Sequence, residues 1–321
     1  SVDALIDFSA SVNENFEIEK IMPAGFSKRG WVTWLLSCVD PRVFATAPIV
    51  LDILNWHENL HHHYRAYGGW SWAFAAYWTE NVSMYIDHPR SAEVFDDLAI
   101  DPIRYNGRLD GMPKMISTAA GDQFFLPDDS YYYYDELSSP KFLSIFENSD
   151  HGMGGHGNRL YDNLMNFFVA AYNDFEWPTL EWDRIESDDE GTLSLRTSEE
   201  PLSVTAFWAD TNNYTCQIER NLTGQPEVCL RDFRERNLVS NTGIWWEETP
   251  VEDEGDGQYS VTMEQRDEDD EGDYRGLLMQ VIYPGFREGD TLDFTTEIHI
   301  FPDTLPFDQC EGEEECRGIL K

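Results

Sequence analysis

The sequence predicts an α/β fold organised around an open parallel sheet, and buried-strand patterns are the first evidence for it. A continuous apolar run at residues 43–51 is typical of a strand covered on both faces of a parallel sheet, and residues 113–120 are expected to form the next strand. A further short run at residues 141–146 has the same character, and residues 160–172 follow it with the spacing of an amphipathic helix. Strands that alternate with helical segments indicate a parallel sheet.

The pattern changes from Trp177 onward, where alternating segments separated by turn residues are typical of antiparallel strands. We therefore expect a partial α/β domain over residues 1–177 and a small all-β, sandwich-like domain over residues 178–321. Residues 179–321 hold 11 basic and 36 acidic residues, so most of the negative charge lies in the second part.

The stretch from Glu19 to Trp31 contains the most informative motif of the first part. A short apolar run ends in Gly25-Phe-Ser-Lys-Arg-Gly30 and continues into an apolar helical segment, which predicts strand, sharp turn and helix. A serine on such a turn is presented as a nucleophile at the head of a helix, whose free N–H groups favour an oxyanion. Arg29 occupies the usual second glycine position, and Gly30 follows one residue late. The alternative is a structural turn without chemistry.

A segment rich in Trp, Tyr and His interrupts the strands at about residues 52–110 and has the size of an inserted helical cap. Residues 1–16 also have apolar positions at helical spacing. The cap aromatics serve mostly for packing, with lining of a substrate pocket as the alternative; they are Trp56, Tyr64, Tyr67, Trp70, Trp72, Tyr77 and Trp78.

Composition limits the function classes. The chain of 321 residues carries 22 basic and 61 acidic residues, a net charge of −39, which argues against nucleic acid and anionic membranes as partners. No stretch approaches the roughly 20 apolar residues of a membrane span.

Cysteines and sequons favour an exported protein. Cys38 lies alone in an apolar helical segment and is expected to be a buried thiol, whereas two close-spaced pairs are disulfide candidates: Cys216 with Cys229, and Cys310 with Cys316. Asn81, Asn213 and Asn221 begin glycosylation sequons. We expect secretion or residence in an endomembrane lumen, with the signal peptide outside this chain.

Three residues form the candidate catalytic set, in the order Ser27, Asp122, His151. Each lies just past the carboxyl end of a predicted parallel strand, where open α/β sheets place their ligand crevice. His151 would accept the hydroxyl proton of Ser27, and Asp122 would fix the imidazole tautomer. The alternative is a scaffold of this kind that has lost turnover.

Neighbouring residues compete for or add to these roles. Asp150 is an alternative acid and His156 an alternative base. The backbone N–H of Lys28 would serve the oxyanion, and the Lys28 and Arg29 side chains would favour an anionic acyl group or assist the oxyanion. The alternative for these two cations is an ordinary surface ion pair.

No metal or cofactor is predicted. Consecutive histidines at 61–63 point in different directions, and although His57 and His61 have i, i+4 spacing, no third ligand is evident. The acidic runs at residues 252–256 and 267–273 could bind calcium in principle, but we interpret them as solvated hairpin tips.

Several motifs together resemble the PhoPQ-activated pathogenicity-related proteins, a family that includes secreted proliferation repressors of amoebae. They are Gly25-Phe-Ser-Lys-Arg-Gly-Trp, Val39-Asp-Pro-Arg-Val, Ile49-Val-Leu-Asp-Ile-Leu-Asn, His61-His-His-Tyr-Arg-Ala-Tyr-Gly-Gly and Gly121-Asp-Gln-Phe-Phe-Leu-Pro-Asp. The resemblance implies an α/β-hydrolase fold with a serine-hydrolase-like site at Ser27, Asp122 and His151. It leaves turnover open, because some members act as signals.

The chain departs from the α/β-hydrolase pattern at its start, where only about 20 residues precede the elbow strand. We expect missing N-terminal strands, one of whose loops would donate the second oxyanion N–H. The leading hypothesis is a secreted serine hydrolase acting on a small-molecule, peptide or carbohydrate ester or amide. A signalling or binding protein with a cell-surface receptor is the alternative. A further alternative is a uronate esterase, because the turn with a cation after Ser27 resembles that of the glucuronoyl esterases.

Overall fold

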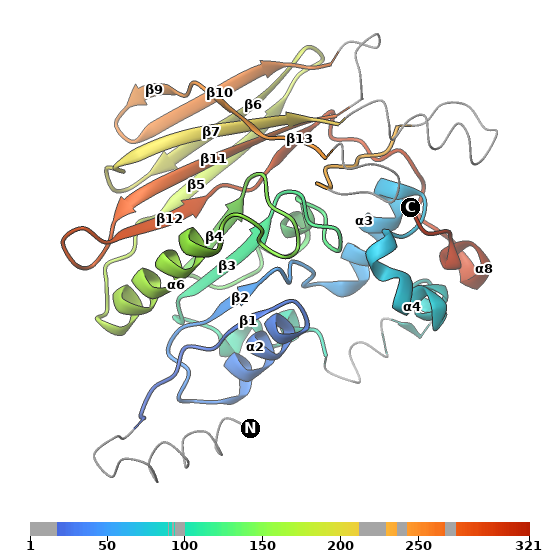
Figure 1. Cartoon of the computed structure of the whole chain (residues 1–321), viewed down its shortest axis with the longest axis horizontal. Helices are drawn as coiled ribbons and strands as arrows, with labels where there is room; N and C mark the ends of the chain where they lie inside the picture. The colour runs from blue at the N-terminus through green and yellow to red at the C-terminus, as the bar shows by residue number, and fades with distance from the viewer. Residues whose placement is uncertain are drawn as a thin grey trace.

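The computed structural model describes residues 18–88, 90–91, 93, 100–211, 229–235, 243–266 and 274–321. Two sheets, one of nine strands and one of four, and the helices between and around their strands make up this part of the chain (Figure 1). The predicted helix at residues 1–16, the acidic run at 267–273, Cys216, Asn213 and Asn221 all lie outside the described residues.

Four parallel strands form one end of the larger sheet, in the order β1–β2–β3–β4, which confirms the predicted parallel sheet. They span Ala24–Phe26, Ala47–Ile49, Lys114–Ala119 and Lys141–Phe146. β1 and β2 are shorter than the apolar runs around them. Pro23 explains part of this, since proline has no N–H for the ladder, and only an isolated bridge joins Ile21 to Val43 before it.

Helices connect and cover these strands. α2 (Lys28–Val39) follows β1, and α6 (Gly157–Tyr172) follows β4, close to the amphipathic helix predicted there. The segment between β2 and β3 is helical, as the cap prediction required. It contains α3 (Trp56–Tyr67), η1 (Trp72–Phe74), α4 (Ala75–Thr79), η2 (Val82–Tyr85) and η3 (Pro102–Arg108).

Strands from the second part of the chain continue the same sheet. β12 (Thr291–Thr295) lies antiparallel to β4 through the pair Thr295 and Leu143, and the order continues through β11 (Arg275–Pro284), β7 (Ser203–Asp210) and β8 (Glu247–Thr249). β13 (His299–Phe301) also pairs with β11. The sheet is therefore continuous across residue 177, where the sequence predicts the start of a second part.

The second, four-stranded sheet is antiparallel and has the order β5–β6–β10–β9. These strands span Leu180–Glu186, Glu190–Thr197, Gln258–Glu264 and Glu252–Gly255. Leu193, Leu195 and Val261 from this sheet share one buried cluster with Phe142 of β4 and Phe294 of β12, so the two sheets have a common core. The run at residues 252–256 is exposed at the β9–β10 hairpin, as interpreted from sequence.

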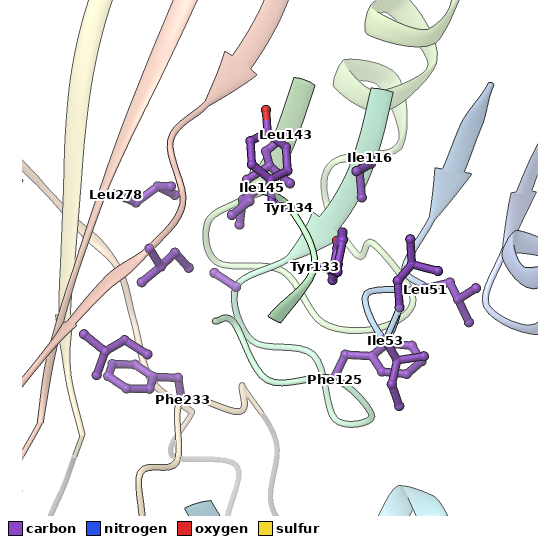
Figure 2. Close-up of a cluster of buried hydrophobic side chains, with 14 of the residues drawn as sticks. Leu51, Ile53, Ile116, Phe125, Tyr133, Tyr134, Leu143, Ile145, Phe233 and Leu278 are labelled. Atoms are coloured by element: carbon purple, nitrogen blue, oxygen red, sulfur yellow. The ribbon is translucent and has the colours of Figure 1, made fainter. Parts of the chain in front are cut away.

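A second buried cluster lies at the carboxyl ends of the parallel strands (Figure 2). Ile116 of β3 and Ile145 of β4 contribute to it, together with Leu51 and Ile53 just after β2. Phe125 and Tyr133 reach it from the loop after β3. The loops that follow the parallel strands pack on this cluster.

Asp52 is a buried acid between Leu51 and Ile53 of this cluster, three positions after the end of β2. It has no exposed surface, it accepts a hydrogen bond from Tyr133 Oη, and its Oδ2 has no hydrogen-bond partner among the described residues. Burial, aided by the nearby charges of Glu297, Asp122 and Asp128, raises the pKa of Asp52 to about 7. The folded protein therefore holds a proton that the unfolded chain releases above about pH 4.

We predict a pH-dependent stability gain for Asp52→Asn. Between about pH 4 and 7 the wild type must take up this proton when it folds. Its free energy of unfolding therefore falls by up to about 1.4 kcal/mol for each unit that the pH rises, whereas the asparagine variant does not have this loss. The amide oxygen preserves the acceptor for Tyr133. Urea unfolding of both proteins should show a stability difference that grows from pH 4 to 7 and is constant above pH 7. A difference that does not change with pH would contradict this assignment.

Candidate active site

The turn between β1 and α2 places Ser27 in a backbone conformation that is unusual for any residue other than glycine. Its φ is 53° and its ψ is −124°. Ser27 N donates to Ile49 O at 2.8 Å, and Gly30 N and Trp31 N donate back to Ser27 O at 2.7 and 3.2 Å. The surrounding hydrogen bonds hold this strained turn in place.

Two glycines allow α2 to approach the strands closely. A Cβ on Gly25 would lie 2.7 Å from Arg29 O, and a Cβ on Gly30 would lie 2.9 Å from Leu51 Cβ. Gly30 thus provides the close contact between helix and sheet although it comes one residue later than in the usual motif. The late glycine does not prevent the sharp turn.

The structure brings the three predicted catalytic residues into contact. His151 Nε2 lies 2.9 Å from Ser27 Oγ, and His151 Nδ1 lies 2.9 and 2.8 Å from the two carboxylate oxygens of Asp122. The Asp122 side chain is fully buried, and 17% of the His151 side chain is exposed. An imidazole with these neighbours can accept a hydroxyl proton while the carboxylate stabilises the resulting cation.

The loop after β3 orients Asp122. Its Oδ1 accepts hydrogen bonds from the backbone N–H groups of Phe124 and Phe125 at 2.6 and 3.3 Å. Burial raises the pKa of Asp122, while His151 and these two N–H groups act against the shift. The Phe124 ring packs against the His151 imidazole at 4.5 Å between centroids and covers one side of it.

A buried network that sequence reasoning did not find supports this loop. Gln123 accepts a hydrogen bond from Ser71 Oγ through its carbonyl, and its Oε1 accepts one from His151 N at 3.2 Å. Arg234 donates to Ser71 Oγ at 3.1 Å and is paired with Asp232 at 2.6 Å. The cap, the loop after β3 that carries Asp122, and residues 231–235 meet at this network. No local sequence signal links segments that are so far apart in the chain.

The competing residues have other contacts. Asp150 Oδ1 accepts hydrogen bonds from Gly152 N and Gly154 N at 2.9 and 3.4 Å, so this side chain stabilises the turn that follows it. The His156 ring packs edge-on against Phe146 at 5.6 Å, at the start of α6. The structure therefore joins Asp122, rather than Asp150, to His151.

Lys28 and Arg29 are both exposed in the first turn of α2. The Lys28 backbone N–H lies at the helix N-terminus next to Ser27, where a developing negative charge would be stabilised. Lys28 also lines the cavity in front of Ser27, and Arg29 does not contribute to its wall.

This cavity has a volume of about 690 Å³ and is bounded by Ser27, the cap and the loop after β3. Four of the cap aromatics singled out from sequence line it: Trp56, Trp70, Tyr77 and Trp78. Tyr64 and Tyr67 are instead buried in packing. Ser27 and aromatic side chains of the cap thus line the same cavity.

Each of the three consecutive histidines has a separate partner. His61 Nε2 lies 3.3 Å from Gln309 Nε2, His62 Nε2 lies 3.0 Å from Asp128 Oδ1, and His63 Nε2 accepts from Ser71 N at 3.0 Å. Burial lowers the pKa of His63 well below its usual value. Over the described ranges no group of three or more His, Cys, Asp or Glu side chains is arranged to hold a metal.

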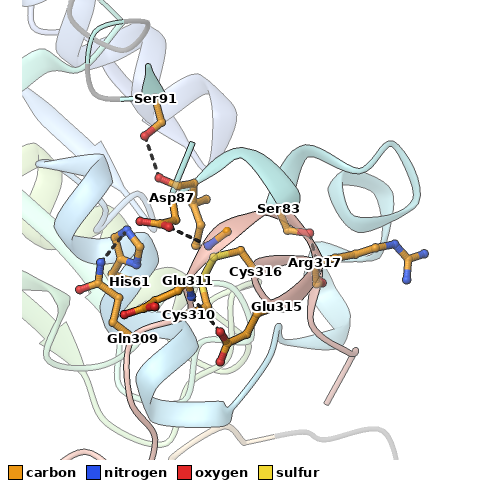
Figure 3. Close-up of a disulfide and its surroundings, with 12 residues drawn as sticks. His61, Ser83, Asp87, Ser91, Gln309, Cys310, Glu311, Glu315, Cys316 and Arg317 are labelled. Atoms are coloured by element: carbon orange, nitrogen blue, oxygen red, sulfur yellow. Dashed lines mark hydrogen bonds between the residues drawn. A yellow bond between two sulfur atoms is a disulfide. The ribbon is translucent and has the colours of Figure 1, made fainter. Parts of the chain in front are cut away.

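The C-terminal segment fixes the outer part of the cap (Figure 3). Cys310 and Cys316 form a disulfide around α8 (Gly312–Arg317). Gly312 N donates to Asp87 Oδ2 at 2.7 Å, and Ser83 Oγ donates to Arg317 O at 3.3 Å. The disulfide predicted between the last two cysteines is confirmed.

The structure also describes two further predicted modification positions, Cys229 and Asn81, and the predicted buried thiol of Cys38. Cys229 is disulfide-bonded, while its expected partner Cys216 lies outside the described residues. Cys38 is a free, buried thiol. Asn81 is exposed beside η2, and its Oδ1 accepts from Arg317 Nε at 3.2 Å. No described helix is both long and apolar enough to cross a membrane.

Comparison with known proteins supports the sequence resemblance. "Autocrine proliferation repressor protein A" of Dictyostelium discoideum is 31% identical over 330 residues, which cover 98% of this chain and 62% of that protein. This chain therefore spans less than two thirds of that relative. An acylaminoacyl peptidase from Pyrococcus horikoshii (TM-score 0.40, 16% identity) matches 55% of this chain with 28% of its own. Acetyl xylan esterase 1 from Thermoanaerobacterium sp. (TM-score 0.37, 19% identity) matches 52% of this chain with 51% of its own.

The family match covers most of the α/β part and more. Residues 1–216 match the family of PhoPQ-activated pathogenicity-related proteins, and the motifs around Ser27 and Asp122 lie within that range. With the parallel sheet and the turn at Ser27, this agrees with the α/β-hydrolase fold expected from sequence. The chain belongs to the PhoPQ-activated pathogenicity-related protein family.

Proposed function

We propose that this chain is a serine hydrolase that cleaves an ester or amide through an acyl-enzyme. The observation that carries the proposal is the continuous set of contacts from Ser27 Oγ through His151 to the buried Asp122. This order of groups is the arrangement that activates a serine hydroxyl. The cavity in front of Ser27 gives a substrate access to it.

The proposed reaction has two steps that balance. Ser27 Oγ attacks the acyl carbonyl while His151 Nε2 takes its proton; the bond to the leaving group breaks, and His151 protonates that alcohol or amine. Water then attacks the acyl carbonyl while His151 Nε2 takes its proton; the bond between the acyl carbon and Ser27 Oγ breaks, His151 returns the proton to Ser27 Oγ, and the acid leaves. The Lys28 N–H would stabilise the oxyanion in both steps.

We further propose that the protein works in an oxidising compartment, after secretion or in an endomembrane lumen. The Cys310–Cys316 disulfide and the exposed Asn81 sequon support this. The amoebal relative is named for repression of proliferation. A signalling role through a receptor is therefore the second candidate function, and Ser27→Ala separates the two, because a pure signal would keep its biological activity.

Covalent labelling tests the nucleophile. A small alkyl fluorophosphonate should form one adduct on the folded protein, and peptide mapping should place it on Ser27. Ser27→Ala should abolish the adduct, whereas Ser187→Ala, in the β5–β6 hairpin, should label like the wild type. Folded protein without an adduct at Ser27 would refute the proposal.

A matched pair of carboxylate variants tests the choice of acid. Asp122→Asn should lower the rate of labelling and ester hydrolysis by about 10⁴-fold, because the imidazole loses the partner that fixes its tautomer. Asp150→Asn keeps the oxygen that accepts from Gly152 N and should change the rate only slightly. Equal effects of the two substitutions, measured on protein with unchanged circular dichroism, would contradict the assignment.

A further inference from the structure

The cavity in front of Ser27 is large enough to hold a substantial substrate group. Its volume of about 690 Å³ lies in the range of roughly 300–1,000 Å³ that is usual for small-molecule sites. At about 30 Å³ per water molecule it offers room for about 20 waters. An acetyl group alone would leave most of this space unused.

The wall of the cavity is predominantly apolar, and nine of its lining residues are Trp, Tyr or Phe. The rings come from three parts of the chain: α2, the cap and the loop after β3. Those used in this argument are Trp31, Trp70, Phe74, Tyr77, Trp78 and Phe124. Such side chains bind apolar and aromatic groups with large contact areas.

The polar ends of three tryptophans are already engaged by the protein backbone. Trp31 Nε1 donates to Ile100 O at 2.6 Å, Trp70 Nε1 to Cys316 O at 2.9 Å, and Trp78 Nε1 to Gly318 O at 3.2 Å. The single N–H donor of each of these indoles already makes a hydrogen bond within the protein, so the indoles contribute only apolar ring surface to the cavity. Water inside gains few hydrogen bonds from such a wall.

Charged residues lie at the edge of the hollow. Lys28 and Glu80 are exposed, and Arg90 is 67% exposed and faces Glu93 at 3.5 Å. A carboxylate placed in the interior of the cavity would lose its hydration and would lie away from these cationic side chains, which is energetically costly. The interior therefore suits an uncharged group.

The wall is also held by distant parts of the chain. The backbone acceptors for Trp70 and Trp78 belong to α8 and the residue after it, next to the Cys310–Cys316 disulfide. Figure 3 shows this C-terminal segment against η2 of the cap. The aromatic surface is thus a built part of the fold.

From these observations we infer that the substrate carries a bulky apolar group, an aryl ring or an alkyl chain of several carbons, next to the bond that Ser27 attacks. The inference rests on the proposed hydrolase function. It disfavours a uronate ester as substrate, because the hydroxyl groups of the sugar would lose hydration in a largely apolar interior. The apolar group can belong to the acyl or the alcohol side of the ester, and the experiment distinguishes these sources.

Two ester series provide the kinetic test. p-Nitrophenyl acetate, butyrate, hexanoate and octanoate vary the acyl side, and acetates of ethanol, butanol, hexanol and octanol vary the alcohol side. In one series kcat/KM should rise about three- to fourfold for each added methylene until the cavity is filled. Flat or falling values in both series, or a preference for methyl glucuronate over p-nitrophenyl octanoate, would overturn the inference.

Binding to Ser27→Ala protein separates this inference from the proposed function. Quenching of tryptophan fluorescence by the p-nitrophenyl esters reports occupancy of the cavity without turnover. Affinity that rises with chain length while the wild type hydrolyses nothing would leave the apolar site standing and refute the hydrolase. Affinity independent of chain length would refute the apolar site even if Ser27 is labelled.

A matched pair of tyrosine variants locates the effect. Tyr77 lines the cavity and is 44% exposed, and Tyr161 of α6 is 62% exposed and outside it. Tyr77→Asp should reduce kcat/KM for the octanoate at least tenfold more than for the acetate, because it places a charge in the wall. Tyr161→Asp should behave like the wild type with both esters. Equal behaviour of the two variants would place the apolar group elsewhere and overturn the assignment.

Discussion

The close approach of α2 to the parallel strands is the constraint on which the rest of the site depends. It is possible because Gly25 and Gly30 have no side chain where Arg29 O and Leu51 lie within 3 Å of the missing Cβ. This approach forces Ser27 to φ 53° and sets its hydroxyl toward the edge of the sheet where the strands end. Any larger residue at either glycine would move the helix and Ser27 together.

The remaining groups reach Ser27 because parallel strands end at a common edge. Asp122 follows β3 and His151 follows β4, so the order of the strands brings a base and an acid to one side of the serine. The loops are then fixed by contacts with the cap and with residues 231–235. The same cap lines the cavity, so one part of the fold both shapes the cavity and fixes the loop that carries Asp122.

Local patterns in the sequence were sufficient for much of this. The run at 141–146 coincides with β4, the run at 113–120 with β3, and the residues just past them with the carboxylate and imidazole that meet Ser27. Buried parallel strands have a strong signal, because both faces must be apolar. The disulfide at Cys310 could be anticipated because its partner is close in sequence.

Pairing between segments that are far apart in the chain could not be predicted from local sequence patterns. β12 has an ordinary strand pattern, and nothing in it indicates that it pairs with β4 and extends the α/β sheet. The indole contacts with the C-terminal segment and the link from Arg234 to Ser71 also join residues more than 150 positions apart. The buried Asp52 appeared in sequence only as the start of the cap, because its protonation follows from tertiary burial.

We propose that Ser27, His151 and Asp122 act as one unit on a substrate held in the cavity that the cap aromatics line. A crystal structure of the protein after reaction with an octyl fluorophosphonate tests it most directly. We expect phosphorus bonded to Ser27 Oγ, His151 Nε2 within hydrogen-bond distance of that oxygen, and the octyl chain among the cap aromatics. Ser27 and His151 side chains separated beyond contact, or an adduct on another residue, would contradict it.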